Sequence, residues 1–178
     1  MDAMECILSR TSIRNFSDQV VEENILCKLL EAGMAAPSAV NMQPWMFVVI
    51  DKRELLDTLA DKLPYAKMLK QAPVAIVVCG DLRKTLDQRE REYWVEDCSA
   101  AAENILLAAH ALGLGAVWTA VHPVPSRIDA VQNTLHMPEY LIPLNVMPLG
   151  YPVEGKAPKE KWDEGKIQWN SWSEEPLS

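Results

Sequence analysis

Residues 36–50 read APSAVNMQPWMFVVI, a polar loop that runs directly into an unbroken apolar segment. The apolar part, 45–50, is bounded by a proline and an aspartate, which predicts a strand buried on both faces. The loop before it carries Ser38, Asn41 and Gln43, whose hydroxyl and amide groups can hydrogen-bond a flat polar ligand. This stretch therefore predicts a ligand-binding loop at the entrance to a buried strand.

The segment RTSIR at 10–14 provides a different set of donors. Arg10 and Arg14 flank two hydroxyl residues, and each guanidinium presents a fixed fork of N–H groups that suits a phosphate. Together with the polar loop, this segment favours a phosphorylated cofactor that carries a ring system. Flavin mononucleotide (FMN) is the first choice. The alternative is that both arginines form ordinary surface ion pairs.

Hydrophobic periodicity divides the chain into alternating helices and apolar strands. Helices are expected at 2–10, 20–36, 53–63, 65–71, 96–112 and 125–133. Strands are expected at 45–50, 73–79, 114–121 and 141–149. This alternation predicts one layered domain, of the α/β or mixed α+β class, over residues 1–178. Residues 151–178 form a C-terminal extension whose tryptophans are expected to pack on the domain or on a partner subunit.

The composition excludes several classes of protein. A net charge of −8 over 178 residues argues against a nucleic-acid binder, which needs a basic face. No apolar stretch approaches the roughly 18 residues of a membrane span, and the start of the chain does not read as a signal peptide. We therefore expect a cytoplasmic protein that does not bind membranes. The four cysteines are scattered without metal-ligand spacing, so we expect them to be reduced and expect no metal site.

Other motifs carry little chemistry. The chain lacks a P-loop and a nucleophile elbow, and GLG at 113–115 lacks the third glycine and the strand-then-helix context of a dinucleotide fingerprint. The charged segment 81–92 is expected to be mobile or to bridge solvent. The next two residues, Tyr93 and Trp94, either cover a pocket or pack in the core.

Five segments, in this order, make the chain resemble the FMN-dependent nitroreductase family. They are RTSIRNF at 10–16, APSAVNMQPW at 36–45, the stretch 97–119, LGYP at 149–152 and PKEK at 158–161. The resemblance implies an α+β layered sandwich in which helices flank a mixed, mostly antiparallel sheet. It also implies an intertwined homodimer with two FMN sites at the subunit interface.

The resemblance assigns site residues to three groups. The FMN phosphate and ribityl end would be held by Arg10, Thr11, Ser12, Arg14 and Lys161, with Lys159 in the same tail segment. The ring system would be reached from the other subunit by Pro37, Ser38, Ala39 and Asn41, and lined by Trp118, Thr119 and Ala120. Two departures from the family pattern matter. Thr119–Ala120 replaces a glycine-containing pair, and Lys161 replaces an arginine fork with a point charge.

The activity that the resemblance implies is transfer of a hydride from NADH or NADPH, through FMN, to an electron-poor small molecule such as a nitroaromatic or a quinone. No catalytic side chain is expected, because the flavin does the chemistry and the protein binds and orients it. Two alternatives stay open: a non-redox protein that sequesters FMN, and an enzyme of the same fold that uses flavin for ring cleavage or dehalogenation. The sequence does not choose between NADH and NADPH.

Overall fold

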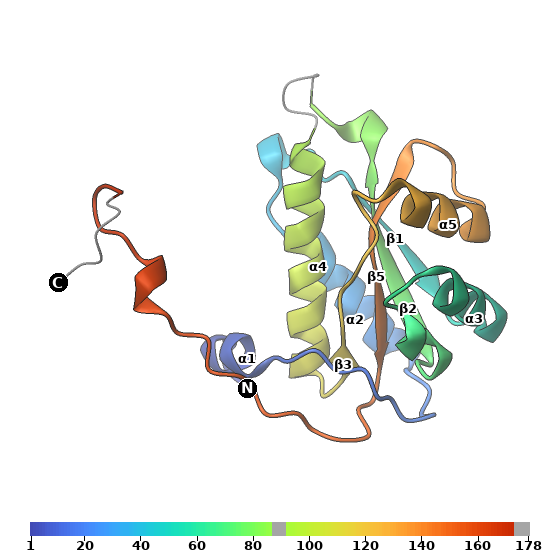
Figure 1. Ribbon diagram of the computed structural model, residues 1–178, viewed down its shortest axis with the longest axis horizontal. Helices are drawn as coiled ribbons and strands as arrows, with labels where there is room; N and C mark the ends of the chain where they lie inside the picture. Colours follow the sequence, from blue (N-terminus) through green and yellow to red (C-terminus); the bar gives the residue numbers. More distant parts are fainter. Residues whose placement is uncertain (87–91, 173–178) are drawn as a thin grey trace.

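The computed structural model describes residues 1–86 and 92–172 (Figure 1). Its helices are α1 (Ala3–Ser9), α2 (Glu23–Met34), α3 (Arg53–Lys62), α4 (Tyr93–Ala111) and α5 (Pro125–Leu135). Its strands are β1 (Trp45–Ile50), β2 (Val74–Asp81), β3 (Gly115–Ala116), β4 (Thr119–Ala120) and β5 (Leu141–Gly150). Short 3₁₀ turns are η1 (Ala39–Asn41), η2 (Lys67–Lys70), η3 (Leu82–Lys84) and η4 (Glu164–Lys166). Of the predicted charged segment 81–92, residues 87–91 lie outside the described residues.

The strands form one sheet in the order β1-β2-β5-β3, and β4 also pairs with β5. Every pairing between these strands is antiparallel. A single parallel bridge joins Ser12, in the amino-terminal segment, to Ala116. The predicted α+β class with a mixed, mostly antiparallel sheet is therefore confirmed.

Helices cover both faces of the sheet, with α2 and α4 on one side and α3 and α5 on the other (Figure 1). The side chains of β2 explain this arrangement, because successive side chains of a strand point to opposite faces of the sheet. Ile76 and Val78 join the core beneath α2 and α4, whereas Val77 and Cys79 join the core beneath α3 and α5. All of β2 is buried, as its apolar run predicts.

The prediction that the strand at 45–50 is buried on both faces holds only in part. Trp45 and Phe47 pack in the core beneath α2 and α4, and Val48 and Ile50 pack in the core beneath α3 and α5, but the strand is not fully buried. β1 is the end strand of the described sheet and pairs only with β2. Met46 and Val49 are 40% and 38% exposed. An apolar run shows that a strand packs against something. It does not show whether a second strand covers the outer edge, because that depends on the order of strands in the sheet.

The single strand predicted at 114–121 is also wrong, because the chain forms two short strands, β3 and β4, with a break between them. Both pair with β5, which carries Pro148 at the break. Val117 still donates its N–H to the Pro148 carbonyl at 3.3 Å, but a proline has no N–H to donate in return. The ladder is therefore interrupted where the candidate site residues lie.

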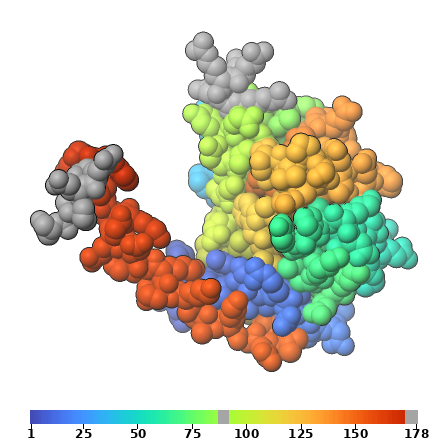
Figure 2. Space-filling model, viewed as in Figure 1, coloured from blue at the N-terminus to red at the C-terminus, as the bar shows by residue number. Residues whose placement is uncertain are grey.

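The carboxy-terminal segment leaves the domain after β5. Figure 2 shows residues from about 155 onward, in orange and red, extending away from the rest of the molecule. Three tryptophans in this segment are largely exposed in the single chain: Trp162 by 70%, Trp169 by 71% and Trp172 by 81%. Within the described residues, no helix is long and apolar enough to cross a membrane.

Candidate functional site

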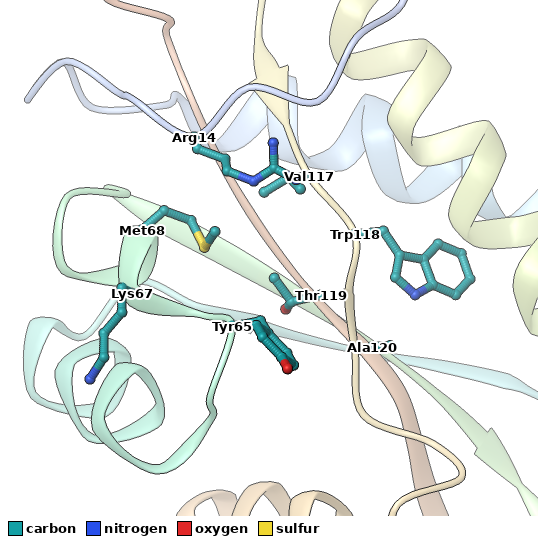
Figure 3. A pocket seen from close by; sticks show the side chains of 8 residues that line it. All are labelled: Arg14, Tyr65, Lys67, Met68, Val117, Trp118, Thr119 and Ala120. Atoms are coloured by element: carbon teal, nitrogen blue, oxygen red, sulfur yellow. The ribbon is translucent and has the colours of Figure 1, made fainter. Parts of the chain in front are cut away.

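A cavity of about 460 Å³ lies between the η2 turn and the β3–β4 segment (Figure 3). Side chains from three separate parts of the chain meet there. The lining residues are Arg14, Tyr65, Lys67, Met68, Val117, Trp118, Thr119 and Ala120. Four of these, Arg14 and residues 118–120, are candidate site residues from the sequence, so the fold brings the predicted phosphate and ring segments together.

Arg14 reaches the cavity because the amino-terminal segment lies alongside β3. Ile13 donates its N–H to the Ala116 carbonyl at 3.1 Å. A Cβ added at Gly115 would lie 2.6 Å from the Ile13 side chain, so glycine is required for this close approach. Among the described residues, Arg14 has no carboxylate partner, which leaves its charge available to a ligand.

The second wall is held by contacts with β5. Thr119 is buried, and its hydroxyl donates to the Val146 carbonyl. Ala120 pairs with Asn145 in the same ladder. Figure 3 shows the Trp118 indole directed away from Arg14 and Met68, and this side chain packs against the core beneath α4. Trp118 therefore borders the cavity without placing its ring across it.

The third wall, formed by Tyr65, Lys67 and Met68, was missed in the sequence, where 65–71 was assigned only to a short helix. The η2 turn is anchored by Arg53 on α3, whose guanidinium donates to the carbonyls of Leu69, Lys70 and Ala72. No local motif signals this wall. Its place beside Arg14 is set by packing between distant parts of the chain.

The other phosphate-end candidates have different surroundings. The Arg10 Nε lies 3.5 Å from the Glu103 carboxylate on α4, so the ion-pair alternative holds for Arg10 but not for Arg14. The Thr11 hydroxyl donates to the Lys156 carbonyl at 3.4 Å, and Ser12 forms the bridge to β3. None of these three residues lines the cavity.

The polar loop lies elsewhere in the same chain, beside the first turns of α4 (Figure 1). Ala39 donates its N–H to the Asp97 carboxylate at 2.8 Å. The Ser38 hydroxyl accepts from the backbone N–H of Gln43 at 3.0 Å, and the side-chain Oδ1 of Asn41 accepts from the Gln43 side-chain amide at 3.1 Å. Sequence reasoning missed Asp97 as the anchor of this loop.

The backbone of that loop is strained. Val40, Asn41 and Gln43 have φ angles of 49°, 57° and 49°, and a β-branched residue rarely adopts this left-handed region. Pro37 is exposed at the loop's start. No residue of the loop lines the Arg14 cavity of its own chain.

The two candidate lysines of the tail also lie apart from Arg14. Lys159 and Lys161 border a second hollow of about 470 Å³, which also includes Leu8 of α1 and Trp162. Trp94 is buried and packs edge-on against His122, with ring centroids 4.9 Å apart. Of the two predictions for Trp94, packing in the core is therefore the one that the structure supports. Neither Tyr93 nor Trp94 lines the Arg14 cavity.

No cysteine lines this cavity, and two of the four are deeply buried. Burial raises the pKa of Cys79 to about 12, and burial, followed by the neighbouring charges, raises the pKa of Cys98 as well. Both thiols therefore stay protonated at neutral pH, and only the thiolate is reactive. The described residues contain no group of three or more histidine, cysteine or acidic side chains placed to hold a metal ion.

A sequence model described as "Nitroreductase family" matches residues 7–64 and 57–151 of the chain. The chain belongs to the nitroreductase family. The two matches together span the Arg14 segment, the polar loop and the β3–β4 segment. The family's fold is thus the scaffold on which the cavity is built.

Individual proteins similar to this nitroreductase-family chain also carry nitroreductase names. It is 44% identical to a "Putative NADH dehydrogenase/NAD(P)H nitroreductase" of Methanothermobacter thermautotrophicus, over 97% of this chain and 88% of that protein. The crystal structure of a protein from Bacteroides thetaiotaomicron, also described as a "Putative NADH dehydrogenase/NAD(P)H nitroreductase", is similar. It is 48% identical, with a TM-score of 0.91, over 96% of this chain and 98% of that one. An FMN-dependent nitroreductase from Clostridium difficile is 31% identical, with a TM-score of 0.87 over 95% and 99% of the two chains.

Proposed function

We propose that this chain is an NAD(P)H-dependent flavin oxidoreductase that holds FMN in the Arg14 cavity and reduces electron-poor acceptors such as nitroaromatics or quinones. The observation that carries the proposal is the convergence of Arg14, an apolar wall and an exposed strand edge on one cavity. Membership of the nitroreductase family supports it, as does the likeness to an FMN-dependent nitroreductase.

The residues present fit FMN. A volume of about 460 Å³ falls within the range of small-molecule sites. Arg14 supplies the cation for the phosphate, and Met68, Tyr65 and Val117 supply apolar surface for a ring. The cofactor, when bound, supplies two-electron transfer between a nicotinamide and an acceptor.

Residues 118–120, which include β4, add donors for the polar edge of the ring. Val117 and Val121 donate their N–H groups to β5, so the alternate residues, Trp118 and Ala120, face away from it. Their backbone groups are thus presented at the edge of the sheet beside the cavity. Arg14 contributes charge-assisted hydrogen bonds of about 1.5–3 kcal/mol each to a phosphate. Arg10, Thr11 and Ser12 shape the segment that carries Arg14.

The functional unit is a homodimer in this proposal. The loop 37–41 and the tail lysines, Lys159 and Lys161, lie away from Arg14 in their own chain, so a partner would bring them to it. An exposed apolar surface supports an interface. It includes Met4 and Leu8 of α1, which are 62% and 66% exposed, together with the tail tryptophans.

The test is to titrate cofactor-free protein with FMN and then to follow oxidation of NADH and of NADPH with a quinone and a nitroaromatic. We expect one FMN per subunit and nicotinamide oxidation that depends on the acceptor. Protein that binds no FMN would contradict the proposal. Protein that binds FMN but oxidises neither nicotinamide would instead be a flavin-sequestering protein.

A further inference from the structure

Arg127, in the first turn of α5, contacts two walls of the cavity without lining it. Its Nη1 donates to the Ala120 carbonyl at 3.2 Å. Its guanidinium carbon lies 5.4 Å from the centroid of the Tyr65 ring. Ala120 and Tyr65 both line the cavity, and Figure 3 shows Tyr65 at the opposite end from Arg14, with Thr119 between them. Arg127 thus lies at the far end of the cavity from the predicted phosphate position.

The charge of Arg127 is not neutralised within the described part of the chain. Its guanidinium takes part in none of the ion pairs found there. A guanidinium has five N–H donors, of which the Ala120 carbonyl takes one. A half-buried arginine that forms none of these ion pairs, at the edge of a ligand cavity, is suited to bind an anion.

The two contacts also fix the direction of this cation. The hydrogen bond to Ala120 and the contact with the Tyr65 ring restrain the side chain from two elements, β4 and the segment before η2. A guanidinium held in this way loses little further freedom when a planar anion binds. Tyr65 is 72% exposed, so a ligand can approach this pair from solvent.

We propose that Arg127 recognises an anionic group, a carboxylate or a phosphate, on a substrate that enters the Tyr65 end of the cavity. The inference rests on the proposed function and adds to it a preference for charged substrates. The anion has two possible sources: an electron acceptor that carries a carboxylate, or the additional phosphate that distinguishes NADPH from NADH.

The experiment compares matched ligands on FMN-loaded protein. Binding of 4-nitrobenzoate and of neutral 4-nitrobenzamide is titrated without reductant through the change in the flavin absorption spectrum, and KM values are measured for NADPH and NADH. Arg127→Gln keeps a donor for Ala120 but removes the charge, and we expect it to lower the anionic-to-neutral preference about tenfold. Arg127→Lys keeps the charge and is expected to retain most of that preference.

Lys28→Gln, at an exposed position of α2, is the matched control, because it removes the same charge at a place away from the cavity. It should leave unchanged both the nitrobenzoate-to-nitrobenzamide affinity ratio and the NADPH-to-NADH ratio of KM values. A shift confined to the nitrobenzoate ratio assigns the anion to the acceptor, and a shift confined to the NADPH ratio assigns it to the nicotinamide cofactor. Equal weakening of charged and neutral ligands, or no change in either ratio, overturns the inference while FMN binding stands. Failure of the unmodified protein to bind FMN overturns the proposed function itself, and this inference with it.

Discussion

Arg10 and Arg14 illustrate how one motif supplies two different side chains. Both belong to the same short segment, yet Arg10 pairs with Glu103 whereas Arg14 faces the cavity. Because a guanidinium already paired with a carboxylate must give up that interaction to bind phosphate, the unpaired one contributes more to a ligand. Arg14 is therefore the residue on which FMN affinity should depend most.

Replacing Arg14 by alanine should weaken FMN binding tenfold to a hundredfold, since about 1.5–3 kcal/mol is lost with each charge-assisted hydrogen bond. Quenching of flavin fluorescence, titrated into cofactor-free protein, measures this. Arg14→Lys is the matched variant and should show a smaller loss, because it keeps the charge but not the fork. An Arg14→Ala protein with unchanged affinity would remove Arg14 from the phosphate site.

At the scale of elements, two short pieces are tied to the fold by arginines, and one of them, η2, forms a wall of the cavity. The η2 turn is held by three carbonyl contacts from Arg53, and the end of β2 is held by Asp81 and Arg83. The Arg83 guanidinium also lies 3.7 Å from the centroid of the Tyr140 ring, just before β5. Arg53 joins α3 to residues 69–72, and Arg83 joins η3 to Tyr140 in addition to its local pair with Asp81.

Arg53→Met should lower the free energy of unfolding by about 1–3 kcal/mol, because it leaves carbonyl groups of η2 without their donor. Urea denaturation followed by circular dichroism measures the change. Asp57→Asn removes only the exposed ion pair of Arg53, whose Nε lies 3.2 Å from the Asp57 carboxylate, and should cost less than about 0.5 kcal/mol. Similar losses in the two variants would show that the carbonyl contacts contribute little.

The Asp81–Arg83 pair makes stability depend on pH in the acid range. Side-chain hydrogen bonds from Arg83 lower the pKa of Asp81 from its ordinary value of 3.8. Because the folded pKa lies below the unfolded one, the carboxylate stabilises the fold above about pH 4, and this contribution is lost as the pH falls through the folded pKa.

Arg83→Gln should therefore reduce the free energy of unfolding at neutral pH, and the difference from the unmodified protein should shrink below about pH 4. Denaturation at a series of pH values measures it. Lys28→Gln, at an exposed position of α2, is the control with little expected effect, because Lys28 does not contact Asp81. A difference that stays constant down to the lowest pH would show that Asp81 is not the partner responsible.

At the scale of the whole molecule, the candidate residues fall into separate places in one chain. Arg14 and residues 117–120 share a cavity, whereas the loop 37–41 lies beside the start of α4 and the tail lysines lie beside α1. Exposed tryptophans on an extended tail would be unfavourable in an isolated chain, because large apolar patches favour association. The homodimer proposed above would account for both features.

Replacing Trp162 and Trp169 by serine should shift the protein from dimer to monomer in sedimentation-velocity experiments and should lower its FMN content. Trp162 and Trp169 are 70% and 71% exposed in the single chain, so their loss should not unfold the domain. Glu154→Ser, another exposed tail position, is the control. An unmodified protein that sediments as a monomer with a full complement of FMN would contradict the dimeric site.

The sequence by itself determined what depends on local interactions. The bounds of β1 follow from an apolar run between Pro44 and Asp51, and α3 ends within one residue of its prediction, because hydrophobic period and bounding residues act over a few positions. The RTSIR motif also pointed to Arg14, and the resemblance to the nitroreductase family pointed to residues 118–120; these residues share a cavity.

Only the tertiary structure decided which segments meet. The exposure of β1 follows from its place in the strand order, and the break between β3 and β4 follows from Pro148 on another strand. Tyr65, Met68 and Arg127 join the site through packing of η2 and α5 against the sheet, for which no nearby residue provides a signal. Such neighbours are set by register and helix packing over the whole chain, and a pattern read over a few residues carries no information about them.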